Sequence, residues 1–254
     1  MRNVFIVPFF LLFFLLPQLI FPVQFLVSPP KIEMDMSRVS IASDSLIIMN
    51  RDTSNITIKC YMRDWGYRNG KKYFSPKGSI DYSASRWITI NPLQFTLMPY
   101  EKKVVRVTVQ KPESTGNHEY RSMIFIESIA KPTKYSRGFL FNARIGVPVY
   151  VETAPKSFNG YIASMAVKND KIEIKYVNGS HNRLYLNGMY SIVNNEEKDT
   201  VKSDSISNIL VLPLDTERID INIDDIKKGD YYIYLYIDNG GENVFGGKKR
   251  FVKE

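Results

Sequence analysis

The stretch between Trp87 and Glu127 constrains the fold more than any other part of this chain. It reads WITINPLQFTLMPYEKKVVRVTVQKPESTGNHEYRSMIFIE, in which short apolar runs are separated by turns marked by proline or glycine. Val105, Val107 and Val109 alternate with polar residues, and a period of two is typical of a strand with one buried face. No long helical period interrupts the pattern. The stretch therefore predicts an all-β protein.

The same reading extends over the rest of the chain and divides it into two domains. About 228 residues follow residue 26, enough for two β-sandwich domains of about 100 residues each. A short polar stretch at residues 153–157 marks the expected seam, so we expect immunoglobulin-like sandwiches at 27–154 and 155–254. The expected strands lie near residues 30–36, 45–50, 55–65, 87–91, 102–110, 119–128 and 138–151, then 160–167, 171–177, 183–194, 206–212, 218–223, 230–238 and 244–252.

The amino-terminal segment, residues 1–26, is set apart from the fold. Residues 4–26 contain no charged side chain and are long enough to cross a bilayer. Pro8, Pro17 and Pro22 interrupt the segment and favour a secretory signal peptide over a retained membrane anchor. Either reading places the remainder of the chain outside the cytoplasm, in the periplasm or cell envelope.

Positive charge is concentrated in the first expected domain. Residues 27–154 hold 19 basic and 11 acidic side chains, whereas residues 155–254 hold 14 and 15. A basic domain outside the cytoplasm could bind an acidic protein partner, anionic lipid or a cell-wall polymer. The alternative is that its basic loop is simply solvated and has no partner. Aromatic residues are interleaved with the basic ones, as on nucleic-acid-binding surfaces, but the export signal argues against nucleic acid. The basic cluster consists of Arg63, Arg68, Lys71, Lys72 and Lys77, and the interleaved aromatic residues are Trp65, Tyr67 and Tyr73.

No motif in the chain points to catalysis, a metal or a cofactor. Cys60 shares strand parity with Ile56, Ile58 and Met62, so we expect a buried thiol. The chain has only two histidines, and with one cysteine they make neither a zinc site nor a nucleophile–base pair. We expect a binding protein rather than an enzyme.

Several segments of the first domain resemble the amino-terminal domain of the periplasmic pilus-assembly chaperones. They are the starting run VSPPKI at 27–32, the turn at Pro99, Val105-Arg106, the run EYR-S-MIF at 119–125, and the long last strand at 138–151. The resemblance covers residues 27–152 and is a diffuse profile. It implies an exported chaperone that captures a pilin-like or other envelope subunit.

The resemblance also implies a binding mode, in which the last strand of the first domain is lent to the partner by β-strand addition. On that strand Phe139, Phe141, Ala143, Ile145, Val147 and Val149 share one face. Phe139 and Phe141 would then enter the subunit's groove. The alternative is that the whole row packs into the core of its own domain.

Two basic residues anchor the subunit's terminal carboxylate in that family. Lys31 matches the first position, and the second falls near Gly146, which has no side chain. Arg144 lies two residues away on the same face, and a guanidinium can hold a carboxylate through two hydrogen bonds. The resemblance therefore predicts that Lys31 and Arg144 converge on one cleft, while Gly146 departs from the family pattern.

Two functions follow from these observations. The first is an exported assembly chaperone, which requires a free strand edge at residues 138–151 and the cleft formed by Lys31 and Arg144. The second is a structural or adhesive surface protein with tandem sandwich domains on a retained membrane anchor at residues 4–26.

Overall fold

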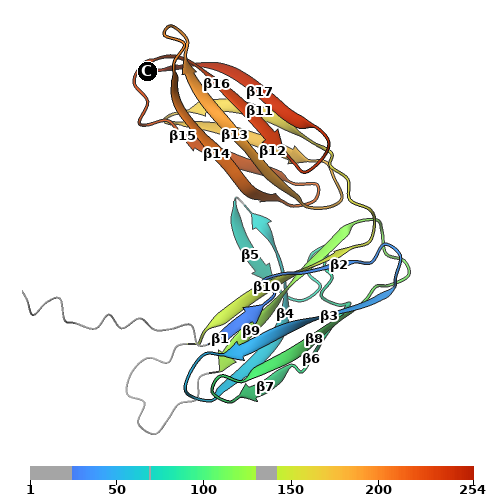
Figure 1. Ribbon diagram of the computed structural model, residues 1–254. Coiled ribbons are helices and arrows are strands. Elements are labelled where there is room, and N and C mark those ends of the chain that lie inside the picture. Colours follow the sequence, from blue (N-terminus) through green and yellow to red (C-terminus); the bar gives the residue numbers. More distant parts are fainter. Residues whose placement is uncertain (1–24, 69, 130–141) are drawn as a thin grey trace, which may run out of the picture.

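The computed structural model describes residues 25–68, 70–129 and 142–254. All regular structure in these ranges is β-strand, which confirms the predicted fold class. Figure 1 shows two sandwiches joined by one connection between β10 and β11. No helix in the described ranges could span a membrane. The expected signal or anchor, residues 1–26, lies almost wholly outside them.

The first sandwich is built from the strands that precede the connection. One sheet has the order β1-β3-β8-β6, and the other has the order β2-β10-β9-β4-β5 with β7 paired to β4. The strands are β1 (Phe25–Ser28), β2 (Ile32–Asp35), β3 (Ile41–Asn50), β4 (Ile56–Arg68), β5 (Lys71–Ser75), β6 (Ile88–Asn91), β7 (Gln94–Leu97), β8 (Lys102–Gln110), β9 (Glu119–Ile129) and β10 (Arg144–Glu152).

The core of this sandwich follows the alternation seen in the sequence. Val105, Val107 and Val109 of β8 are fully buried between the sheets, and Cys60 of β4 is buried as expected. Burial in these apolar surroundings raises the pKa of the Cys60 thiol to about 11. Phe25 is also fully buried, so the first sandwich includes the two residues before the expected start at residue 27.

The second sandwich consists of the strands after the connection. Its sheets have the orders β11-β12-β15 and β14-β13-β16-β17, and no strand pairs with the first sandwich in the described residues. A separate apolar core lies between them. The strands are β11 (Gly160–Lys168), β12 (Lys171–Asn178), β13 (Leu184–Asn194), β14 (Thr200–Val211), β15 (Thr216–Asn222), β16 (Gly229–Asp238) and β17 (Val244–Lys253).

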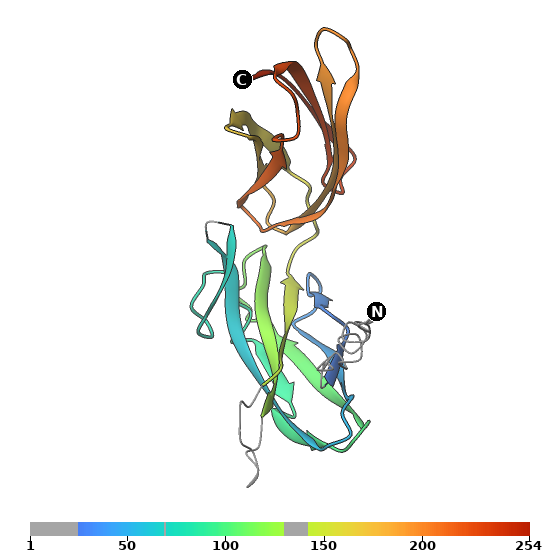
Figure 2. The ribbon, with the colours of Figure 1, turned by 90° about the vertical axis from the view of Figure 1, so that its left-hand side faces the viewer.

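The hairpin formed by β4 and β5 projects toward the second sandwich, as Figures 1 and 2 both show. Figure 2 also shows β10 running up to the connection between the sandwiches. Because β4, β9 and β10 are neighbours in one sheet, the outer face of that sheet is bordered by the second sandwich at one end. This face and the edge of β10 make up the candidate site.

Candidate partner-binding site

Strand β10 has one fully paired edge and one partly free edge. β9 pairs with all of β10, whereas β2 pairs in parallel only with Val149–Glu152. Among the described residues, no strand pairs with the β2-side edge of residues 144–148. The expected free edge at 138–151 is therefore corrected: residues 149–151 are already covered by β2, and residues 138–141 lie outside the described ranges.

The backbone groups that this edge presents can be identified from its neighbours. Ser128 N–H donates to the carbonyl of Ala143 toward β9, and Met36 N–H donates to the carbonyl of Glu152 on the opposite side. In a strand, successive residues point their backbone groups to opposite edges. The even-numbered residues Arg144 and Gly146 therefore direct an N–H and a carbonyl to the free edge, whereas Pro148 has no N–H to present there.

The apolar row on β10 faces the core of its own domain along the described part of the strand. Val147 and Val149 are fully buried, and Ala143 and Ile145 are partly buried against the same core. Burial therefore decreases toward the start of the strand. Phe139 and Phe141, the residues expected to be donated, lie outside the described residues.

Lys31 and Arg144 occupy different levels of the sheet. Ile32 pairs with Val149, so Lys31 is level with Pro148, four residues or about 13 Å along β10 from Arg144. Lys31 binds Glu33 at 3.0 Å and lies 5.5 Å from the ring of Tyr185. The two cations are not brought together, in contrast to the expected convergence on one cleft.

Arg144 instead belongs to the middle of the sheet's outer face. Its guanidinium lies 4.9 Å from the ring centre of Phe125 and 3.5 Å from the hydroxyl of Tyr61. Gly146 follows on the same face, where an added Cβ would lie 3.0 Å from Met123 Sδ and 3.1 Å from Phe125 Cε1. The absence of a side chain lets these two residues cover the strand. A side chain at Gly146 would therefore require Met123 or Phe125 to shift.

Aromatic side chains dominate the rest of this outer face. Phe125 is 5.0 Å from Phe74 and 5.5 Å from Tyr61, measured between ring centres. At the end nearer the second sandwich, Leu212 completes a buried cluster with Trp65, which places this end of the face in the domain interface. We call the set the aromatic face: Tyr61, Trp65, Tyr67, Phe74, Phe125 and Tyr150.

The basic cluster predicted from the sequence lies on the β4–β5 hairpin beside this face. Lys72 Nζ lies 5.0 Å from the ring of Trp65 and 5.8 Å from that of Tyr67. Arg68 lies 5.0 Å from the ring of Tyr73 across the hairpin. Two cations of the cluster, Lys72 and Arg68, therefore lie over aromatic rings.

Arg121 is the functional candidate that the sequence reasoning missed. It lies on β9, where its Nε donates to the carbonyl of Trp65 at 3.3 Å and its guanidinium lies 5.8 Å from the Trp65 ring. Its Nη1 is buried and has no hydrogen-bond partner among the described residues. Burial lowers the pKa of Arg121. A buried donor without a partner is costly, so an incoming acceptor would be favoured here.

A buried ionic network holds the two sandwiches together next to this site. Arg183, in the connection between β12 and β13, contacts the carboxylates of Glu33, Glu119 and Glu152, the last at 3.3 Å. Its guanidinium also lies 3.8 Å from the centre of the Tyr150 ring. Burial raises the pKa of Glu119 to about 7. Burial alone would lower the pKa of Arg183, but Glu119, Tyr185 and Glu33 together outweigh it and the pKa of Arg183 is raised.

The sequence did contain a signal for the aromatic face. Tyr61, Trp65 and Tyr67 share the strand parity opposite to Cys60, so all three point out of the first core. Aromatic residues in alternate positions on the face opposite the core indicate a second contact surface. Arg183 carried no comparable signal, because its three carboxylate partners come from distant parts of the chain.

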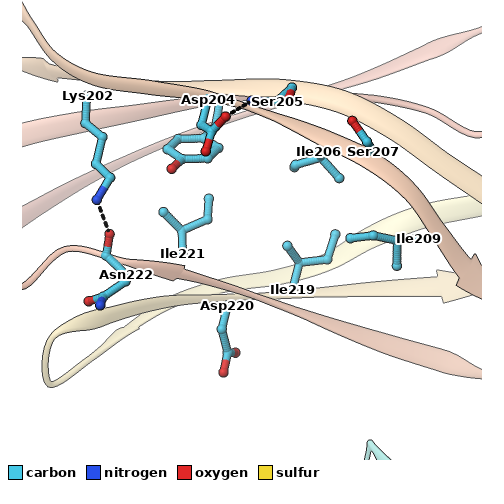
Figure 3. A pocket seen from close by; sticks show the side chains of 11 residues that line it. Lys202, Asp204, Ser205, Ile206, Ser207, Ile209, Ile219, Asp220, Ile221 and Asn222 are labelled. Atoms are coloured by element: carbon cyan, nitrogen blue, oxygen red, sulfur yellow. Dashed lines mark hydrogen bonds between the residues drawn. The ribbon is translucent and has the colours of Figure 1, made fainter. Parts of the chain in front are cut away.

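A hollow of about 390 Å³ lies in the second sandwich, away from these residues (Figure 3). It opens between β14 and β15, with Ile206, Ile209, Ile219 and Ile221 on its apolar side. Lys202 spans one end and donates to the carbonyl of Asn222 at 2.8 Å. No cluster of three or more potential metal-ligating side chains occurs in the described parts of the chain.

Comparisons with known proteins agree with this architecture. No protein-family model and no curated protein matches the sequence. Among solved structures, the class 5 fimbrial chaperone CfaA has a TM-score of 0.55 at 15% identity, over 91% of this chain and 100% of that chain. A structure of a chaperone–tip adhesin complex of CFA/I fimbriae has a TM-score of 0.56 at 15% identity, over 90% and 98%.

The CupB2 chaperone of Pseudomonas aeruginosa has a TM-score of 0.50 at 11% identity, over 90% of this chain and 100% of that chain. These similarities extend over both sandwiches and confirm, for the fold, the resemblance expected from residues 27–152. This chain has the two-domain fold of the fimbrial assembly chaperones.

Proposed function

We propose that the protein is an exported, non-catalytic assembly chaperone that captures a pilin-like or other envelope subunit by β-strand addition along β10. The observation that carries the proposal is the free edge at residues 144–148, whose outward backbone groups pair with no other strand in the described parts of the chain. An extended segment of the partner would continue the sheet through main-chain hydrogen bonds. The similarity to chaperones of fimbriae supports this class of partner.

The aromatic face supports the same proposal, because it adjoins the free edge on the outer side of the sheet. A partner that adds a strand to β10 would cover this face, and buried aromatic side chains contribute much of the affinity in protein interfaces. Phe139 and Phe141 continue the alternate row of Ala143 and Ile145 in the sequence and remain the proposed donated residues.

Arg121 is the cation that we propose for binding an acidic group of the partner, such as a terminal carboxylate. Its Nη1, for which the described residues provide no hydrogen-bond partner, lies beside Trp65 at the end of the aromatic face nearer the second sandwich. Lys31 and Arg144 remain proposed partner contacts, but at separate points of the surface.

The strand-addition proposal is tested with two variants of one exposed residue. Arg144→Pro removes an outward N–H from the free edge, whereas Arg144→Ala removes the same side chain and keeps that N–H. Both are compared with the wild type in capturing exported subunits encoded alongside the protein. We expect Arg144→Pro to reduce capture at least about tenfold relative to Arg144→Ala. Equal capture by the two variants, with both folded, contradicts strand addition at this edge.

The donated residues are tested separately with the double variant Phe139→Asp/Phe141→Asp. We expect loss of capture with an unchanged unfolding transition, because the aspartates could not enter an apolar groove. A double variant in which the first domain unfolds would show that both side chains belong to its core, and the donor role would then be wrong.

A further inference from the structure

The only two histidines of the chain meet at the junction of the two sandwiches. His118 lies immediately before β9, and His181 lies between β12 and β13. Their Nδ1 atoms are 3.0 Å apart, and their rings are 4.1 Å apart between centres and nearly perpendicular. At this distance one Nδ1 must donate a proton to the other, so at least one ring accepts in its deprotonated form.

The backbone around the pair also crosses the junction. Glu119 N–H donates to the carbonyl of His181 at 2.8 Å, and Thr153 Oγ1 accepts from His118 N–H at 3.0 Å. A shift of either ring would therefore be transmitted to the start of β9 and the end of β10. Both strands hold residues of the ionic network that joins the sandwiches.

We propose that the His118–His181 contact is a pH-sensitive latch between the two domains. When both rings are neutral, or when only one of them is cationic, a hydrogen bond between them joins the domains. With both rings cationic, neither Nδ1 can accept, and two like charges face each other at the junction. Acidification below the ordinary histidine pKa of about 6.5 therefore opens the junction.

The sign of the effect follows from proton linkage. Burial and the neighbouring His181 lower the pKa of His118 in the closed arrangement. The closed form thus binds fewer protons than the open form. The equilibrium constant that favours the closed form is largest above about pH 6.5. Below that pH it falls by up to about tenfold per pH unit for each proton that the closed form excludes.

Other charged and titratable groups surround the pair. Tyr82 packs on the His118 ring at 4.6 Å, and Glu119, Glu152 and Arg183 form the adjacent network. Lys156 binds Glu152 from the connecting segment at 3.1 Å. Glu119, whose pKa is raised to about 7, takes up a proton in the closed form and favours that form as the pH falls. Glu119 therefore acts against the latch, and the test must keep it constant.

The test compares the purified protein with two single variants of the exposed His181, in both of which Glu119 is unchanged. His181→Gln keeps a polar side chain but cannot titrate, and His181→Arg carries a permanent charge. Nuclear magnetic resonance follows the imidazole signals from pH 8 to 5, and small-angle X-ray scattering follows the separation of the domains. The wild type contributes only two imidazole signals, so each can be assigned with one variant.

We expect a wild-type histidine pKa below 6.5, a higher pKa for His118 in His181→Gln, and domain separation in the wild type as the pH falls. His181→Gln should lose that change, and His181→Arg, which already carries one charge, should separate as soon as His118 alone is protonated. Two independent titrations at ordinary pKa values, or an identical scattering response in the wild type and His181→Gln, would overturn the proposal.

Discussion

Arg183 is the residue on which the domain junction depends most. Its side chain is almost fully buried and contacts three carboxylates, all of them from the first sandwich. A buried cation is tolerated only when its charge is compensated, and the same holds for the buried Glu119. One guanidinium therefore binds carboxylates as distant in the sequence as Glu33 and Glu152.

Replacement of Arg183 by methionine should be strongly destabilising, because Glu119 would remain buried without its cation. We expect a loss of about 3–5 kcal/mol in the free energy of unfolding, measured by urea denaturation at pH 8. Lys31→Met, which breaks an exposed ion pair, is the matched control and should cost less than about 1 kcal/mol. Equal effects of the two variants would contradict this role of Arg183.

Cys60 provides a second prediction at the residue scale. The thiol is buried, and its pKa is raised to about 11, so almost no thiolate exists at pH 8. Alkylation by iodoacetamide, followed by mass spectrometry, should be at least about a hundredfold slower in the native protein than in urea. Rapid alkylation of the native protein would contradict the burial of β4 in the first core.

At the scale of elements, alternation in the sequence predicted the long strands well. The expected strands at 102–110 and 171–177 match β8 and β12 almost residue for residue. The short strands β1 and β5 were not predicted. β1 begins inside the segment that was expected to be a signal or anchor, and the lysine-rich β5 reads as a loop. β5 is a strand because it pairs with β4, and this pairing cannot be recognised from the residues of β5 alone.

The β4–β5 hairpin carries the clearest prediction for an element. Phe74 is 47% exposed on this hairpin and packs on Phe125 at the aromatic face. We expect Phe74→Ala to weaken partner capture about tenfold while the unfolding midpoint stays nearly unchanged. Tyr236→Ala, which removes a similarly exposed ring (51%) from β16 of the second sandwich, should leave capture intact. Capture that falls equally in both variants would exclude a specific role of the aromatic face.

At the scale of the whole molecule, the sequence indicated two sandwiches but not how they meet. Composition placed the basic excess in the first domain, and the structure places two of its cations, Lys72 and Arg121, over the Trp65 ring beside the second. The expected convergence of Lys31 and Arg144 depended on the register between β2 and β10. That register is a tertiary property, and it puts the two residues at different levels. Arg121 became a candidate only once its unpaired Nη1 was located.

The proposed function depends on the free edge of β10, and hydrogen exchange tests that edge most directly. In the isolated protein, the outward amides of Arg144 and Gly146 should exchange rapidly, whereas those of Ile145 and Val147, paired with β9, should already be protected. In the complex with its exported subunit, we predict that Arg144 and Gly146 become protected as well. A complex that leaves both amides unprotected would contradict strand addition along β10.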